Sequence, residues 1–230
     1  EMTRRNFTLF SLASLALAGT SGFMLGKVEP KVHLRPPGAV ENFESLCIKC
    51  GQCVQVCPYH SIELLGFDDG VNLGTAYINA SKRGCYLCDL FPCVLACPSG
   101  ALSHNTSEIK DVYMGVAVVK NLEQCLAFKA QSVETSHIQH LLARKSYNER
   151  EQEVKDILSA NLGKTCALCV NSCPVNGALV FERQEQRQVV SVKDECVGCG
   201  VCEEVCFARV IEVVPHAKHR QKFKTKEKNE

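Results

Sequence analysis

The sequence predicts an α+β fold of two tandem cysteine-rich modules, with a helical insertion in the second module. Three observations predict it. The 230 residues include sixteen cysteines, the cysteines fall into four groups of four, and a short run of strand-forming residues follows each group. Hydrophobic residues make up 46% of the chain, but this share includes the cysteines, so the conventional apolar core is small. We therefore expect bound metal or disulfides to replace part of the core.

Residues 1–27 are predicted to form a targeting segment. Arg4 and Arg5 precede an apolar run over 9–18, which is the pattern of a twin-arginine export signal. That route carries proteins already folded with their cofactors, so it suits a metal-rich periplasmic protein. Residues 7–25 are also 19 uncharged residues, long enough for an anchor that stays in the membrane. Cleavage and retention of the segment both stay open.

The first module is expected at 43–110, after an extended, proline-containing linker at 28–42. Its first cysteine group has the spacing C-x-x-C-x-x-C-x-x-x-C-P, and its second group has two additional residues in the middle gap. These groups are Cys47, Cys50, Cys53 and Cys57, then Cys85, Cys88, Cys93 and Cys97. Strands are predicted after the groups, at 61–65 and 100–102.

The second module is expected at 111–214, with strands at 178–181 and 210–214. Its two groups are Cys125, Cys166, Cys169 and Cys173, then Cys196, Cys199, Cys202 and Cys206. Forty residues separate Cys125 from Cys166, but closing this longer loop costs only about 2 to 3 kcal/mol more, because loop entropy grows logarithmically. A strand-like approach precedes both Cys125 and Cys196, which supports Cys125 as a first ligand.

This spacing is typical of bacterial-type dicluster ferredoxin modules. Three thiolates of the compact run bind one [4Fe-4S] cube, and the fourth, before a proline, binds the neighbouring cube. The rule uses every cysteine once and predicts four [4Fe-4S] clusters. The predicted ligand sets are Cys47, Cys50, Cys53 and Cys97; Cys85, Cys88, Cys93 and Cys57; Cys125, Cys166, Cys169 and Cys206; and Cys196, Cys199, Cys202 and Cys173.

Zinc binding and disulfide bonding are two other uses of the cysteines. A structural zinc protein prefers two separated C-x-x-C pairs, and a quartet within eleven residues would crowd a single tetrahedral ion. A disulfide framework requires an exported chain. Within the cluster interpretation, a count of three clusters stays open if Cys125 is not a ligand.

Residues 130–164 have the clearest helical periodicity and predict a helical hairpin or one broken helix. The hairpin either covers the second cluster pair or offers a docking face to a partner. For His137 and His140 within it we expect capping or solvated roles. Residues 215–230 form a basic tail, either solvated or attracted to an anionic membrane or an acidic redox partner.

The composition narrows the function further. The net charge is +1, so we expect no nucleic-acid partner bound through a global positive field. The sequence offers no evident catalytic acid-base pair and no glycine-rich phosphate loop. We therefore expect a protein that conducts electrons and does not itself transform a substrate.

Several short motifs add a resemblance. They are Gly74-Thr75-x-Tyr77, Phe91-Pro92-Cys93, Ala96-Cys97-Pro98-x-Gly100-Ala101-Leu102, Met114-Gly115-x-Ala117-Val118 and Cys125-Leu126-x-Phe128. Together with the cysteine order and the twin-arginine start, they resemble the NapG/MauM group of ferredoxin-type proteins over most of the chain. The departures are the long insertion after Phe128 and the absence of a proline at Phe207.

The resemblance implies a periplasmic or membrane-attached polyferredoxin with four [4Fe-4S] clusters. Its expected partners are an integral membrane iron-sulfur protein that oxidises quinol and a downstream c-type cytochrome or reductase, as in nitrate respiration. The alternative function is the four-cluster electron-transfer subunit of an exported molybdenum oxidoreductase. A zinc or disulfide structural protein is the remote alternative.

Overall fold

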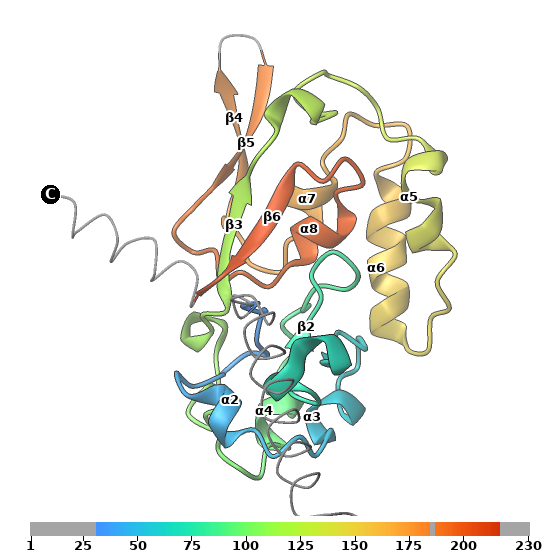
Figure 1. Ribbon diagram of the computed structural model, residues 1–230. Coiled ribbons are helices and arrows are strands. Elements are labelled where there is room, and N and C mark those ends of the chain that lie inside the picture. The colour runs from blue at the N-terminus through green and yellow to red at the C-terminus, as the bar shows by residue number, and fades with distance from the viewer. Residues whose placement is uncertain (1–30, 185–186, 217–230) are drawn as a thin grey trace, which may run out of the picture. The chain divides into compact units, whose positions relative to one another are not determined.

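The computed structural model describes residues 31–184 and 187–216 (Figure 1). The predicted targeting segment at 1–27, the first part of the predicted linker, and the basic tail beyond His216 lie outside these residues. In the part that is described, no helix is both long enough and apolar enough to cross a membrane.

Short helices and strands are interspersed along the described chain, which gives a mixed α+β fold (Figure 1). In chain order they are α2 (Phe43–Leu46), α3 (Gln52–Gln55), β1 (Ile62–Leu64), η1 (Phe67–Asn72), β2 (Ala76–Ile78), α4 (Pro92–Leu95), η2 (Ile109–Asp111), β3 (Gly115–Val119), η3 (Leu122–Gln124), α5 (Thr135–Leu142), α6 (Glu149–Ala160), α7 (Leu168–Asn171), β4 (Leu179–Gln184), β5 (Arg187–Val192), α8 (Val201–Val205) and β6 (Ile211–Pro215). The strands pair antiparallel as β1–β2, β3–β6 and β4–β5.

The cysteine-rich region up to residue 110 is built on the β1–β2 hairpin. The strand predicted at 61–65 is present as β1, whereas the strand predicted at 100–102 is wrong. Leu102 makes only one isolated bridge, with Ala39, because Gly100 turns the chain with a φ of 71°. The preceding segment, predicted to be extended, packs here through a second bridge between Leu34 and Ile78.

The following region repeats this plan with longer strands. Its first and last strands, β3 and β6, pair from Gly115 opposite Pro215 to Val119 opposite Ile211. The β4–β5 hairpin lies between them in the sequence. The strands predicted at 178–181 and 210–214 are therefore confirmed as β4 and β6.

Four one-turn helices mark the repeat. Each of α3, α4, α7 and α8 carries the third cysteine of its group, and α3 contacts α4 as α7 contacts α8. These cysteines are Cys53, Cys93, Cys169 and Cys202. The two helix pairs bring the groups of one region together.

Residues 130–164 contain α5 and α6, which lie side by side (Figure 1). Their apolar residues Ile138, Leu141 and Leu158 are buried. The backbone N–H of Glu134 donates to Nδ1 of His137, so His137 has the capping role expected of it, and His140 is exposed. The first turns of α6, from Glu149, are rich in charged residues.

Candidate iron-sulfur sites

The sixteen thiols are all free of disulfides, and the fold gathers them into four quartets. We name the quartets by the order of the predicted clusters. Site 1 is Cys47, Cys50, Cys53 and Cys97; site 2 is Cys57, Cys85, Cys88 and Cys93; site 3 is Cys125, Cys166, Cys169 and Cys206; and site 4 is Cys173, Cys196, Cys199 and Cys202. Among the described residues, no three Cys, His, Asp or Glu side chains are close enough to bind a single metal ion.

At site 1, all four thiols line one cavity, together with apolar residues of α2, β1 and β2. Burial and the neighbouring Cys47, Cys50 and Cys97 raise the pKa of the Cys53 thiol to about 11. Cys50 is exposed, and it is the one exposed cysteine of the sixteen. Site 1 is therefore the quartet that is most accessible from solvent.

Site 2 has the crossed arrangement that the spacing predicts, since Cys57 comes from the first group and the other three thiols from the second. All four line one cavity. Burial raises the pKa of Cys93 to about 12, with smaller contributions from the neighbouring Cys88 and Cys57. The backbone N–H of Ser61 donates to Sγ of Cys57 over 3.3 Å.

Site 3 tests the placement of Cys125, the most distant cysteine in the sequence. Cys125 is buried and lines one cavity with Cys166, Cys169 and Cys206. Burial and these three neighbours raise the pKa of Cys169. The forty-residue gap is bridged by the α5–α6 hairpin, whose ends meet where Val133 bridges Leu162.

Site 4 is formed by Cys173 from the third group and three thiols of the fourth. Burial raises the pKa of Cys199 to about 12, and the nearby Cys173 and Cys196 act in the same direction. The N–H of Ala117 on β3 points at Sγ of Cys196, 3.5 Å away. The first strand of the second region therefore reaches this site directly.

Backbone amides around the sulfurs form a second pattern, which the cysteine spacing does not reveal. The fourth cysteines Cys57, Cys97 and Cys206 each accept a backbone N–H at 3.3 to 3.4 Å from a residue four or five positions later. At Cys97 these donors outweigh burial and lower the pKa of the thiol. Such N–H groups stabilise a thiolate and tune the potential of a cluster bound to it.

The quartets also lie in a definite spatial order. Cys53 of site 1 lies near Cys93 of site 2, and Cys169 of site 3 lies near Cys202 of site 4. Between the regions, the N–H of Cys85 donates to the carbonyl oxygen of Cys199 over 2.7 Å. The order is therefore site 1, site 2, site 4, site 3, which differs from the order along the chain.

The donor set fits [4Fe-4S] clusters. In sites 1 to 3 the four thiols line one cavity and do not converge on one point, and in each of the four sites a backbone N–H is directed at a sulfur. Burial resists ionisation of most of these thiols, so a cationic cluster is needed to hold them as thiolates. When bound, such a cluster supplies one-electron transfer.

Comparison with known proteins agrees with this chemistry. The family model described as the 4Fe-4S dicluster domain matches residues 46–101 and 164–210. The ferredoxin-type protein NapG of Escherichia coli is 34% identical over 197 residues, covering 80% of this chain and 71% of that protein. The methylamine utilization ferredoxin-type protein MauM of Paracoccus denitrificans is 31% identical over 220 residues, covering 90% of this chain and 84% of its relative.

The chain belongs to the NapG/MauM family of ferredoxin-type proteins. As a member of the family, it is an iron-sulfur electron-transfer protein with 4Fe-4S dicluster domains. No solved structure matches the chain. A third relative, the MauM protein of Methylobacillus flagellatus, is 32% identical over 181 residues. The match covers 75% of this chain and 63% of the MauM protein.

Within this NapG/MauM-type chain, the residue that departs from the motif has a structural partner. Phe207 stands where the other three groups have proline, and its ring stacks on His137 of α5 with centroids 4.2 Å apart and an interplanar angle of 2°. The position without proline is therefore in direct contact with the α5–α6 segment.

Proposed function

We propose that the protein is a relay of four [4Fe-4S] clusters that passes single electrons between a membrane quinol-oxidising partner and a periplasmic redox protein. The observation that carries this proposal is the spatial series of four thiol quartets, in which each quartet has a neighbour. All sixteen cysteines act as ligands in it, in the four sets named above as sites 1 to 4. Cys125 belongs to the third set.

The architecture assigned to this function is two tandem dicluster modules. The first comprises residues 43–110 and the second 111–214, and residues 130–164 are interpreted as an insertion in the second. Support comes from the repeated plan of cysteine loop, one-turn helix and strand, and from the family match to two separate stretches of the chain.

Site 1 is proposed as one port of the relay and site 3 as the other, because they lie at the two ends of the series. Exposure of Cys50 brings site 1 within reach of a partner's redox group. Large apolar side chains surround this end: Ile48 is 63% exposed and Leu64 is 43% exposed, and both line the site 1 cavity. An apolar rim around an exposed ligand suits a protein partner.

The cellular setting is proposed from the twin-arginine motif at Arg4 and Arg5 and from the relatives. The protein is exported to the periplasm and is associated with the membrane, where an integral membrane iron-sulfur protein oxidises quinol. The other partner is a c-type cytochrome or a reductase such as nitrate reductase. Some relatives are named NapG and others methylamine utilization proteins, so the names do not identify one partner. The partner is identified by the proteins that copurify with this chain. A stoichiometric molybdenum enzyme with no quinol-linked partner would favour the alternative subunit role.

The cofactor content is tested on anaerobically purified protein. Four cubes require about sixteen irons per chain, together with low-temperature EPR signals after reduction. Serine replacements of the third cysteines, Cys53→Ser, Cys93→Ser, Cys169→Ser and Cys202→Ser, test the assignment. Each should remove or perturb one cluster, with a loss of up to about four irons, and leave the others. A preparation with zinc and negligible iron would contradict the relay.

A further inference from the structure

The two proposed modules meet backbone to backbone beside Cys85 and Cys199. A Cβ added to Gly84 would lie 2.4 Å from the backbone N of Val201, and a Cβ on Gly200 would lie 2.6 Å from Cβ of Ala80. The hydrogen bond from Cys85 N–H to the carbonyl oxygen of Cys199 lies in the same place. This joint is therefore the point where site 2 faces site 4.

A buried carboxylate holds the joint from the second module. Glu204 lies on α8, between the third and fourth cysteines of the fourth cysteine group, and it is only 5% exposed. Its Oε2 accepts the backbone N–H of Gly84 over 2.8 Å and the hydroxyl of Tyr86 over 3.0 Å. The two donor residues flank Cys85, so Glu204 is hydrogen-bonded to the chain on both sides of a site 2 cysteine.

The α5–α6 segment supplies the positive charge that this carboxylate needs. Nη1 of Arg144, just after α5, donates to Oε1 of Glu204, and its Nη2 donates to the carbonyl oxygen of Lys82 over 2.6 Å. Arg83 of the first module lies 3.9 Å from the same carboxylate. Burying a carboxylate is unfavourable unless it is paired and hydrogen-bonded, and these two guanidinium groups provide that pairing at the joint.

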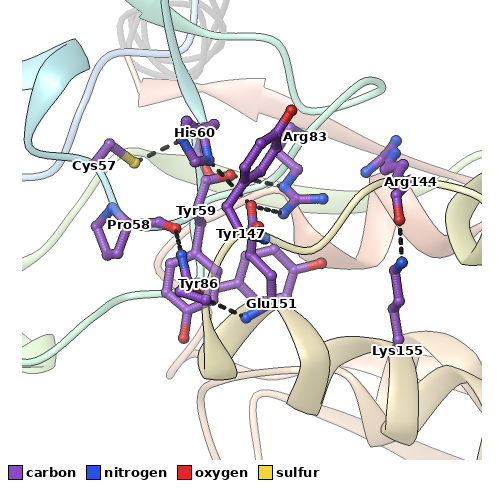
Figure 2. Close-up of polar contacts among 12 residues, drawn as sticks. Cys57, Pro58, Tyr59, His60, Arg83, Tyr86, Arg144, Tyr147, Glu151 and Lys155 are labelled. Atoms are coloured by element: carbon purple, nitrogen blue, oxygen red, sulfur yellow. Dashed lines mark hydrogen bonds and ion pairs between the residues drawn. The ribbon is translucent and has the colours of Figure 1, made fainter.

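A second contact ties α6 to the first module next to site 2. The buried Glu151 receives a hydrogen bond from Nη2 of Arg83 over 2.8 Å and lies 3.1 Å from Nδ1 of His60. Nδ2 of Asn148 donates to the carbonyl oxygen of Pro58, the residue after Cys57, over 2.7 Å. Figure 2 shows Arg83 and Glu151 beside His60 of the Pro58–His60 turn.

We propose that Glu204 is a positioning residue for electron passage between the modules, and that the α5–α6 segment is a strap that fixes this joint. The inference rests on the proposed function. In this proposal Glu204 binds no cluster. Its carboxylate holds Cys85 against Cys199, and an electron that leaves the cluster on one side of the joint is gained by the cluster on the other side, with no bond or proton transferred.

The test compares Glu204→Ala with Glu204→Gln and with Glu203→Ala in holoprotein carrying its clusters. Glu203 is the matched control, because it lies on the same helix but accepts the N–H of Val213 within its own module. Hydrogen exchange at residues 84–86 should be at least about tenfold faster in Glu204→Ala, which corresponds to about 1.4 kcal/mol. Glutamine keeps an acceptor for the Gly84 N–H, so Glu204→Gln should show a smaller increase.

EPR of the fully reduced protein gives a second readout. The magnetic interaction between sites 2 and 4 should weaken in Glu204→Ala and stay unchanged in Glu203→Ala, while iron content is retained in both. Arg144→Ala removes the partner of Glu204 on the α5–α6 segment, and it should also raise the rate of hydrogen exchange at residues 84–86. This variant provides the test if Glu204→Ala does not fold. Unchanged exchange and unchanged coupling in the folded variants would overturn the inference. Absence of clusters from the unmutated protein would instead overturn the proposed function.

Discussion

Gly84 gives the sharpest test of the joint between the modules. Its φ lies outside the left-handed range, so alanine can adopt the same backbone conformation there. The methyl group, however, would sit 2.4 Å from the backbone N and 2.6 Å from Cα of Val201. Ordinary contact begins near 3.4 Å, so the two backbones must separate by about 1 Å. Gly84→Ala therefore acts as a wedge between Cys85 and Cys199.

The size of the effect follows from overpacking. Forcing a methyl group into a filled space costs about 1 to 3 kcal/mol. If that cost falls on the joint, the hydrogen bond from Cys85 to Cys199 opens more often, and the Cys85 amide exchanges roughly 5-fold to 150-fold faster.

The assay is hydrogen exchange and reduced-state EPR on anaerobically purified Gly84→Ala. Gly66→Ala is the matched control, because a Cβ at Gly66 meets nothing within 4 Å and its φ is −85°. The control should match the unmutated protein in both readouts. If Gly84→Ala also matches it, with all iron retained, then the backbones are not in contact and the reasoning is wrong.

Three further predictions concern the sites themselves. Cys125→Ser should perturb site 3 and leave the EPR signals of sites 1 and 2 intact, and an unchanged spectrum would exclude Cys125 as an essential ligand. Anaerobic chelation should remove iron from site 1 first, because Cys50 is exposed, and iron counts paired with EPR along the time course would show any other order. His137→Ala should remove both the stack on Phe207 and the acceptor for the Glu134 N–H at a cost of about 1 to 3 kcal/mol, seen as a lower midpoint in thermal unfolding, with His140→Ala as the exposed control.

Cysteine spacing predicted which thiols come together, including Cys125 across its long gap. This was possible because most ligands of a [4Fe-4S] cluster are separated by only a few residues, so their spacing can be recognised in the sequence. The strands β1, β4 and β6 were predicted for a similar reason, since each begins at or just after the turn that follows a fourth cysteine. The strand β2 was not predicted, because its three residues gain their pairing from β1 across the η1 loop and from Leu34, contacts that no cysteine spacing indicates.

The order of the sites could not be predicted from spacing. It depends on the contact of Gly84 with Val201, two residues far apart in sequence whose meeting follows from packing of whole modules. Glu204 was missed for the same reason. A glutamate between two motif cysteines normally faces solvent, and nothing beside it in the sequence reveals the Gly84 amide or Arg144 as its partners.

The close approach of Gly84 and Gly200 also bears on how such proteins can be recombined. A foreign ferredoxin module grafted onto either half would bring correctly spaced cysteines, yet a side chain at either glycine position would hold the graft away from its neighbour. A functional chimera therefore needs glycine at both positions and an acceptor equivalent to Glu204. In this chain, the interchangeable unit is the pair of modules, not the single module.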